Sequence, residues 1–448
     1  TALCLTIGLA AGCSSGNTDT AGAEETNTES NGEKTKLTVQ SWQYALGNYK
    51  GFTEDDDIEA AIEEEFEASH PDIDLEVILT RQEDHYNQLR VDLSAGTAPD
   101  VIGIAAGSTL EQFKTQLEPL APYAEEEWGE NWKEKFVADA FTNVEMSGEE
   151  IYAFPSAMSV AGTVWYADEQ LTAGGVDAMP ATWEELIEAS STLRENGSIP
   201  MVFGGQDAWE NYDMFITIMG SINKDLCNQI FNLEADWNQE DVVKAFEYFQ
   251  QLYTEGIVQD GAATTTIYNE GYSVWRDDDG YGDASMIFNG SWDLGSLNSS
   301  NPYYDVFSKR GIGVSTLPSI EGKDSIAIVA PDVSWAITGS SEVKDAAWEF
   351  IRWMVDDMQQ AVVDGLGFFS VLQDAPEMTT ETTEEYQNVY DTVADIIASG
   401  NTVGFREALY TEMSDALFDN LQLLATGGTT PAEAAQAMSD ACSSISAQ

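Results

Sequence analysis

The residues of this chain best suited to chemistry are flat aromatic rings that stand beside acids, amides and glycines in short polar segments. Four segments carry this mixture, at residues 206–213, 290–293, 332–335 and 367–369. Sugar rings present an apolar C–H face and a rim of hydroxyl groups, so the sites that bind them combine aromatic faces with side chains that form paired hydrogen bonds. The pattern therefore predicts a site for a polyhydroxylated ligand. Its candidate residues in these segments are Asp207, Trp209, Trp292, Asp293, Asp332 and Phe369.

Two tryptophans and one arginine are the most informative candidates. Trp209 and Trp292 lie in polar segments that contain glycine, which favours binding over burial. Arg406 is one of only 18 basic residues and follows Val403-Gly404-Phe405 in a predicted loop, so we assign it to the same site as a hydrogen-bond donor. Three other tryptophans lie at helical spacings and are expected to fill cores: Trp183, Trp348 and Trp353.

Further candidates follow the ends of two predicted strands. The first strand, around Leu37 and Val39, continues into Ser41-Trp42-Gln43-Tyr44, and a later strand over residues 101–105 precedes Gly107-Ser108. Ligands of open α/β sheets bind beyond the carboxyl ends of the strands. We therefore expect an exposed Trp42, with Tyr44 and Ser108, at the rim of a cleft.

Hydrophobic periodicity predicts the elements that position these residues. Ile58, Ile62 and Phe66 recur every four residues, as on one face of a helix, and residues 73–79 alternate as in a strand. The apolar run over residues 101–105 is typical of a strand covered on both faces. The order strand, helix, strand predicts a parallel sheet with right-handed crossovers.

A second unit begins near Ile151 and contains a predicted strand over residues 163–166. Thr182 with Glu185, and Thr430 with Glu433, form the capping-box pattern that marks the start of a helix. With 43% hydrophobic residues, the chain is long enough for two globular domains with separate cores.

Composition limits the partners and cofactors. The chain has 79 acidic and 18 basic residues and a formal net charge of −61, which argues against nucleic acid and anionic lipid as partners because both require Lys and Arg. With two histidines and no zinc-type spacing, no metal or other cofactor is predicted. Aligning the acidic run 277–283 with a calcium loop would place Trp275 at the first ligand position, so we interpret that run as a solvated turn. Cys227 and Cys442 are compatible with a disulfide or with two buried thiols.

The N-terminal segment resembles a bacterial lipoprotein signal. An apolar run at Ala2–Ile7 precedes Leu9-Ala10-Ala11-Gly12-Cys13, which resembles a lipobox, and the run is too short to span a bilayer. Residues 1–12 are therefore predicted to be a signal peptide and Cys13 a lipidated residue. Residues 13–35 are expected to form a tether, because the segment after Cys13 has no large apolar side chain. The predicted location is the outer face of the cytoplasmic membrane, with contact to lipid only through this anchor.

A series of motifs in order also resembles a known family. The chain is similar, over nearly all of its folded region, to the extracellular solute-binding proteins of bacterial ABC sugar importers, the maltose-binding-protein type. The motifs are Glu63-Glu64-Glu65-Phe66-Glu67, His70-Pro71-Asp72-Ile73, Tyr86-Asn87-Gln88-Leu89, Gly96-Thr97-Ala98-Pro99-Asp100-Val101, Trp165-Tyr166-Ala167-Asp168 and Asn289-Gly290-Ser291-Trp292.

This resemblance implies an α/β fold of two lobes, each a mainly parallel sheet flanked by helices, joined by a hinge that the chain crosses several times. It implies an N-terminal lobe at residues 36–157 and 329–371 and a C-terminal lobe at residues 158–328 and 372–448. It also implies that Trp292 is an aromatic platform for a sugar and that Ser108 lies near a polar sugar contact.

The leading hypothesis is a monomeric, non-catalytic protein that captures a neutral oligosaccharide by lobe closure and delivers it to an ABC permease in the membrane. Two alternatives stay open. A secreted glycoside hydrolase would use two of the many carboxylates as its acid and base. A binding protein for a cationic solute such as a polyamine would suit the negative charge.

Overall fold

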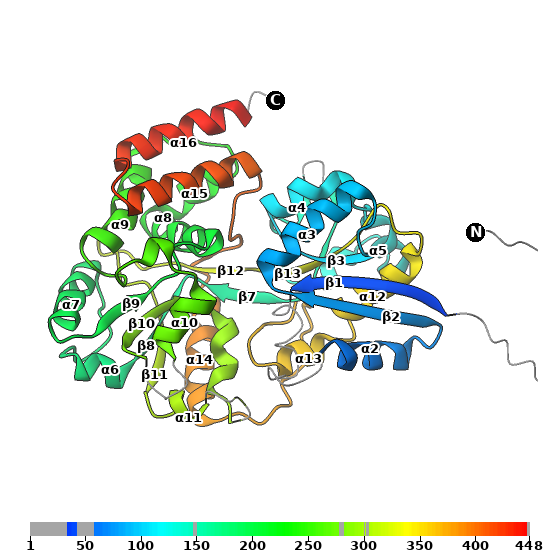
Figure 1. Ribbon diagram of the computed structural model, residues 1–448, viewed down its shortest axis with the longest axis horizontal. Helices are drawn as coiled ribbons and strands as arrows, with labels where there is room; N and C mark the ends of the chain where they lie inside the picture. The colour runs from blue at the N-terminus through cyan, green and yellow to red at the C-terminus, as the bar shows by residue number, and fades with distance from the viewer. Residues whose placement is uncertain are drawn as a thin grey trace, which may run out of the picture.

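The computed structural model describes residues 34–42, 58–146, 150–276, 282–299, 301 and 304–445. The signal segment with Cys13, most of the predicted tether, Tyr44 and the acidic residues 277–281 lie outside these ranges, so the predictions made for them stay predictions. Within the described part, helices and strands form two lobes, each built around its own sheet (Figure 1).

The first lobe is built on a five-stranded sheet of order β2-β1-β3-β13-β6. β1 pairs in parallel with β2 and β3, whereas β13 runs antiparallel to β3 and β6. The strands are β1 (Thr35–Trp42), β2 (Ile73–Thr80), β3 (Val101–Ala105), β6 (Phe154–Pro155) and β13 (Val333–Ile337). The helices of this lobe are α2 (Ile58–Ser69), α3 (Gln82–Ala95), α4 (Ser108–Phe113), α5 (Ala121–Trp128), α12 (Lys344–Val355) and α13 (Gln359–Asp364), with 3-10 turns η2 (Lys114–Gln116) and η3 (Trp132–Lys135).

The second lobe is built on a four-stranded sheet of order β11-β8-β10-β9, in which only β9 and β10 pair in parallel. Its strands are β8 (Thr163–Ala167), β9 (Ile199–Val202), β10 (Ala284–Asn289) and β11 (Ile312–Thr316). Its helices are α6 (Asp168–Ala173), α7 (Trp183–Glu195), α8 (Ala208–Phe231), α9 (Glu240–Thr254), α10 (Tyr272–Trp275), α11 (Tyr304–Phe307), α14 (Glu384–Ala398), α15 (Thr411–Ala425) and α16 (Pro431–Ile445). Shorter turns are the 3-10 helices η4 (Ala262–Thr264) and η6 (Ser291–Leu297) and the π-helix η5 (Ile267–Gly271).

A three-stranded sheet of order β14-β12-β7 runs between the lobes (Figure 1). It contains β7 (Met158–Ala161), β12 (Ala327–Pro331) and β14 (Thr402–Val403), and a two-stranded sheet pairs β4 (Glu145–Met146) with β5 (Glu150–Ile151). β7 precedes the first strand of the second lobe and β12 precedes β13 of the first lobe. The chain thus crosses between the lobes through this sheet.

The predicted α/β class with two lobes is confirmed, but the sheets are mixed and not mainly parallel. Periodicity identifies a strand and its buried face; it carries no information on the direction of a partner that joins from far along the chain, as β13 joins β3. The predicted helix face of Ile58, Ile62 and Phe66 is buried in α2 as expected.

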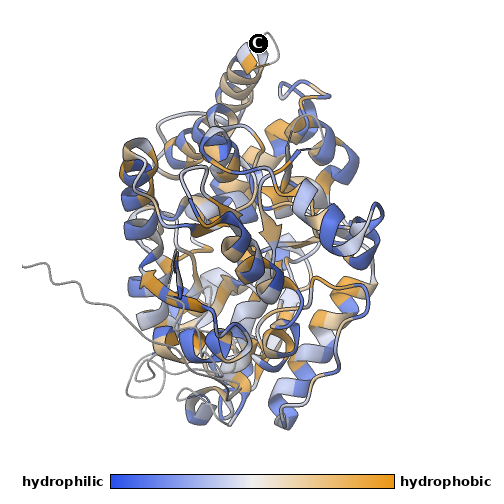
Figure 2. Ribbon diagram, turned by 90° about the vertical axis from the view of Figure 1, so that its right-hand side faces the viewer, coloured by the Kyte–Doolittle hydropathy of each residue, from blue (hydrophilic) through white to orange (hydrophobic). Residues whose placement is uncertain are grey.

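The cores also agree with the sequence. Apolar colour concentrates on the strands and on the inner sides of the helices (Figure 2). Trp183, Trp348 and Trp353 are buried, which confirms that these tryptophans fill the core. Cys227 and Cys442 are buried thiols, and no disulfide joins them. None of the helices in the described ranges has the length and apolar character needed to cross a bilayer.

Thr182 and Thr430 both cap their helices as predicted, although the Glu185 carboxylate accepts the N–H of Ala181 and not that of Thr182. The second cap gives a stability prediction. The Thr430 hydroxyl accepts the Glu433 N–H at 3.3 Å, and the Thr430 N–H donates to the Glu433 carboxylate at 3.0 Å. Thr430→Ala is expected to lower the free energy of unfolding by about 1 kcal/mol, because the first turn of α16 loses its cap. Urea unfolding followed by circular dichroism measures the change. Thr426→Ala is the control, since its hydroxyl bonds the Gln422 and Leu423 carbonyls of the preceding helix and caps no helix start; equal losses in both variants would contradict the capping role.

Candidate functional site

Four side chains from distant parts of the sequence meet at the junction of the lobes. Trp209 lies in the first turn of α8, Trp292 in η6, Asp332 directly after β12, and Arg406 between β14 and α15. We call these four residues the aromatic corner. All four were predicted as site residues, and contacts centred on Arg406 link them in the structure.

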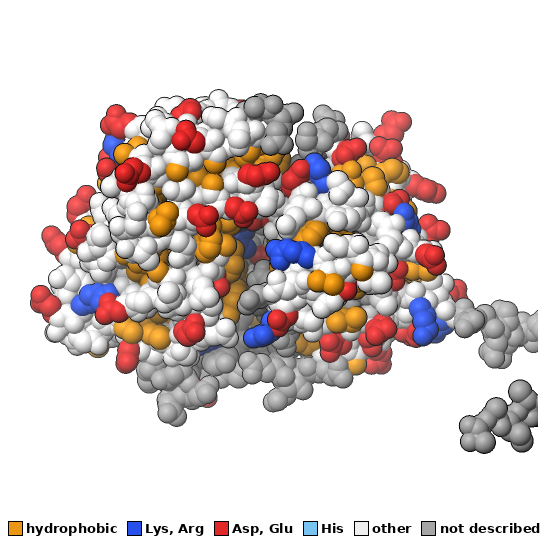
Figure 3. All heavy atoms as spheres, turned by 45° about the horizontal axis from the view of Figure 1, so that its top comes forward, with side chains coloured by type: hydrophobic (Ala, Val, Ile, Leu, Met, Phe, Trp, Pro, Cys, Tyr) orange, Lys and Arg blue, Asp and Glu red, His pale blue; other side chains and the backbone are white. Residues whose placement is uncertain are grey.

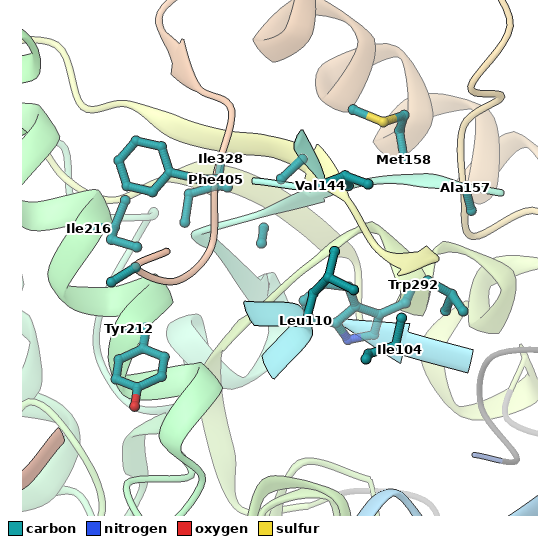
Figure 4. Packing of buried hydrophobic residues seen from close by; sticks show 14 of the residues in the cluster. Ile104, Leu110, Val144, Ala157, Met158, Tyr212, Ile216, Trp292, Ile328 and Phe405 are labelled. Carbon is teal, nitrogen blue, oxygen red and sulfur yellow. The ribbon is translucent and has the colours of Figure 1, made fainter. Parts of the chain in front are cut away.

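Local sequence places the two rings. Trp292 follows Gly290, where a Cβ atom would overlap the indole, so a glycine is required for the ring to fold back on the strand end. The hydroxyl of Ser291 accepts the N–H of Val160 at 3.1 Å and ties this turn to β7. Trp292 is 7% exposed and belongs to a buried hydrophobic cluster, so the expectation that it avoids burial is wrong, whereas Trp209 is half-buried. Figure 4 shows Trp292 together with Ile104 and Met158, which belong to the same buried cluster.

Arg406 is held by two carboxylates. Its Nη2 donates to Asp213 at 2.6 Å, its Nε bonds both oxygens of Asp213 at 3.1 and 3.2 Å, and its Nη1 donates to Asp332 at 3.2 Å. The side chain of Asp213 is 1% exposed and that of Asp332 is 10% exposed. Burial raises the pKa of Asp213 and of Asp332, and the guanidinium of Arg406 opposes this shift in both.

The guanidinium also lies over both indole rings. Its central carbon is 4.9 Å from the ring centre of Trp292 and 5.4 Å from that of Trp209. The two indoles meet edge to face at 5.8 Å, and Tyr268 stacks on Trp209 at 5.8 Å. Cation–π contacts of this kind fix the rings in place. The corner therefore combines rigid aromatic surface with hydrogen-bonding groups, as a sugar site needs.

Two predicted acids support the corner through bonds within the protein. Asp207 accepts the N–H of Ile267 at 2.7 Å and so holds η5, which carries Tyr268. Asp293 is 5% exposed, accepts from the amide of Asn289 at 2.9 Å and lies 3.6 Å from Arg276. Their carboxylates are thus engaged by the fold.

Phe369 and Ser108 lie at the margins of this region. Phe369 is half-buried, stacks on Tyr390 at 5.9 Å, and pairs its backbone with Met158. Ser108 begins α4 and is 7% exposed. The Thr411 hydroxyl donates to the carbonyl oxygen of Ser108 at 3.3 Å, so Ser108 faces the chain segment that carries Arg406.

The prediction of an exposed Trp42 is wrong. Trp42 is 4% exposed and its ring packs against His85 at 5.6 Å and Tyr86 at 5.8 Å. The physical reason is that β1 lies between β2 and β3, so a side chain at its end is still covered by the adjoining helix α3. A polar neighbourhood in the sequence does not reveal this central position.

Sequence reasoning missed Glu407, Asp213 as an ion-pair partner, and Tyr268. Burial raises the pKa of Glu407 to about 7, and its carboxylate accepts the N–H of Thr109 at 3.3 Å. Asn143 donates its side-chain amide to the Glu407 carbonyl at 2.8 Å. These bonds join residues 298 and 264 positions apart, and no local pattern marks them. Of these three residues, only Tyr268 could have been recognised from the sequence, because it is an aromatic residue in a polar segment. Its exposed fraction is 42%.

A furrow separates the two lobes, with hydrophobic side chains along one wall (Figure 3). A cavity of about 540 Å³ lies along the segment that precedes Arg406, with Asn143, Asn228 and Phe405 among its lining residues. It shares no residue with the aromatic corner. Among the described residues, no group of three or more His, Cys, Asp or Glu side chains is arranged to hold a metal ion.

His85, under Trp42, gives a pH prediction. Its Nε2 bonds the Gly103 carbonyl at 2.8 Å, and burial lowers its pKa to about 4 from an ordinary value of 6.5. Between pH 6.5 and 4 the unfolded chain binds a proton at this residue and the folded protein does not, so this group makes the free energy of unfolding fall as the pH drops, by about 3 kcal/mol at most. An NMR titration of the histidine ring signals should give a midpoint near 4 for His85, which the His85→Gln spectrum identifies; a midpoint above 6 would contradict the buried, neutral ring.

Comparison with known proteins places the chain in a family. The family model described as "Bacterial extracellular solute-binding protein" matches residues 49–361. The chain belongs to this family. The resemblance predicted from the motifs is therefore confirmed, and the family is one of extracellular binding proteins and not of enzymes.

Individual relatives are distant. The chain is 23% identical over 322 residues to the maltotriose-binding protein of Pyrococcus abyssi, an alignment that covers 70% of this chain and 63% of that relative. The chain thus spans less than two thirds of that relative's length. Among solved structures, one described for xylan utilization by Caldanaerobius polysaccharolyticus has a TM-score of 0.73 at 18% identity and covers 90% of this chain and 99% of its own. A chitin oligosaccharide binding protein has a TM-score of 0.73 at 17% identity and covers 93% and 100%. At these identities the structural likeness shows the fold.

Proposed function

We propose that this protein captures an oligosaccharide between its two lobes and delivers it to an ABC permease. The observation that carries the proposal is the aromatic corner, where two indoles, a guanidinium and carboxylates meet at the lobe junction. An apolar sugar face suits the indole rings, and the polar groups suit its hydroxyls. The relatives support the same ligand class, since those described above are named for maltotriose, xylan and chitin oligosaccharides.

Capture in this proposal depends on lobe movement. In this proposal the N-terminal lobe comprises residues 36–157 and 329–371, and the C-terminal lobe comprises residues 158–328 and 372–448. The corner takes Trp209 and Trp292 from the second lobe, and Asp332 lies where β12 leads to the first lobe. A sugar that touches both lobes favours the closed state through contacts that exist only there. The protein acts as a monomer, and no bond in the sugar is broken.

Calorimetric titration tests the ligand class. Maltotriose, xylotriose and N-acetylchitotriose are titrated into the protein, and at least one is expected to bind with a dissociation constant of about 10 μM or tighter. Analysis of the bound sugar after a long incubation should return it unaltered. Absence of binding across this panel and a wider glycan array would overturn the proposal, and cleaved sugar would favour a hydrolase instead.

The lipid anchor is a separate part of the proposal. Cys13 lies in a lipobox-like segment, and an acylated cysteine would hold the protein at the outer face of the cytoplasmic membrane. Expressed in a bacterium with lipoprotein processing, the chain should partition into detergent phase, and Cys13→Ala should move it to the aqueous phase. Equal partitioning of both forms would overturn the anchor without affecting the sugar proposal.

A further inference from the structure

We propose that the aromatic corner sorts sugars by charge: it accepts a neutral ring or one that carries an amine, and it rejects the same ring carrying a carboxylate. This inference rests on the proposed function and names the class of oligosaccharide. It starts from the state of Arg406, the basic side chain at the centre of the corner.

The guanidinium of Arg406 already bonds and packs against groups of the protein. Nε and Nη2 bond Asp213, Nη1 bonds Asp332, and the indoles of Trp209 and Trp292 lie against the guanidinium. A carboxylate on a sugar is usually bound by a cation that is able to pair with it, most often an arginine that donates two parallel hydrogen bonds. Here two protein carboxylates occupy those positions. A ligand carboxylate near Arg406 would therefore meet two negative groups beside the one cation, and the paired position on Nε and Nη2 is already taken by Asp213.

Acids also outnumber bases around the corner. Glu407 follows Arg406 directly in the chain. Glu210 follows Trp209 and is fully buried, and burial raises its pKa well above the ordinary range, so the charge at the corner is set mainly by Asp213 and Asp332 against Arg406. The acids also affect one another. Burial is the largest cause that raises the pKa of Asp213 and of Glu210. The charge of Asp332 raises the pKa of Asp213 further, and the charge of Asp213 does the same for Glu210.

The consequence for a ligand follows from Coulomb's law. Two like unit charges about 6 Å apart, at an effective dielectric constant of about 20, repel by an energy that corresponds to about a hundredfold in affinity. Arg406 cancels part of this repulsion, so we expect a sugar carboxylate at the corner to weaken binding at least tenfold. An ammonium group in the same place meets the opposite sign. The net charge of −61 on the whole chain adds a longer-range effect in the same direction, which salt screens.

The test compares sugars that differ only in charge. Maltotriose, its form with a C6 carboxylate on one terminal ring, and its form with a 6-amino group there are titrated at pH 7, with the same series on N-acetylchitotriose. The expected dissociation constants rise at least tenfold from neutral to carboxylate and are equal or lower for the amine. Equal or tighter binding of a carboxylate form overturns the inference and leaves the sugar proposal standing. Absence of binding by every sugar overturns both.

Two variants locate the effect. Asp332→Asn removes one carboxylate next to Arg406, and Glu407→Gln removes the neighbouring one with little change of shape; the variants are compared at pH 8, because the pKa of Glu407 is about 7 and its carboxylate is mostly charged there. The ratio of the carboxylate to the neutral dissociation constant is expected to fall at least fivefold in whichever variant folds. Asp356→Asn is the matched control, because Asp356 also pairs with a base, Lys135, at 2.8 Å. Asp356 lies at the C-terminal end of α12 in the first lobe, outside the aromatic corner. An unchanged ratio in the corner variants, or an equal fall in the control, would overturn the assignment.

Discussion

Replacing Arg406 with alanine is expected to lower the free energy of unfolding by about 3–5 kcal/mol and to abolish sugar binding. The loss is large because Asp213, whose side chain is 1% exposed, would be left buried without its cationic partner, and both the unpaired charge and the proton uptake that removes it cost free energy. The two indoles would also lose the cation that lies against them. Chemical unfolding and calorimetric titration measure the two effects.

Arg352→Ala is the matched control. Arg352 and Arg406 have the same side-chain exposure of 20%, but the partners of Arg352 at 3.1 and 3.3 Å, Glu349 and Asp357, are 42% and 52% exposed. Exposed pairs contribute about 0–1 kcal/mol, so this variant should be close to wild type. The double variant Arg406→Ala with Asp213→Asn should regain part of the lost stability, because the isolated charge is gone. Equal losses for Arg406→Ala and Arg352→Ala would contradict the buried ion pair.

Replacing Trp209 with alanine is expected to weaken sugar binding at least about thirtyfold, which corresponds to about 2 kcal/mol. Trp209 is half-buried and links the corner, since it contacts Trp292, Tyr268 and the guanidinium of Arg406. Its removal takes away a platform for the sugar and the lateral support of Trp292. Trp209→Phe should retain part of the affinity because an aromatic face remains.

Trp128→Ala separates binding from general packing. Trp128 is also half-buried and also lies near a cation, Lys135 at 5.1 Å, but it belongs to α5 of the first lobe. We expect lower stability in this variant and an unchanged dissociation constant. If Trp209→Ala bound sugar as tightly as Trp128→Ala, the aromatic corner would not be the binding site.

Local patterns in the sequence predicted the parts of the fold that depend on near neighbours. The buried face of α2 and the cap of α16 depend on residues within eight positions of one another, and both are present. Strand direction in the second lobe and the position of Trp42 depend on which strands become neighbours across long stretches of chain. Those features were predicted wrongly because they depend on which strand becomes the neighbour, and a local pattern does not contain that information.

The candidate site also combines features that residue type reveals with features that depend on contacts between distant parts of the chain. Residue type selected Trp209, Trp292 and Arg406, since a rare base and tryptophans in polar segments are unusual in this acidic chain. The ion pair of Arg406 with Asp213 joins residues 193 positions apart, so no spacing could reveal it. Acids such as Asp207 and Asp293 have the right type for binding, yet the fold uses their carboxylates to hold backbone and side chains.

A crystal structure of the protein with the tightest-binding oligosaccharide tests the central claim most directly. The account predicts a sugar ring between the lobes, with its apolar face on Trp209 or Trp292 and a hydroxyl group within hydrogen-bond distance of Asp332 or Arg406. A sugar bound elsewhere, such as in the cavity lined by Asn143 and Asn228, with the aromatic corner free of ligand, would contradict it.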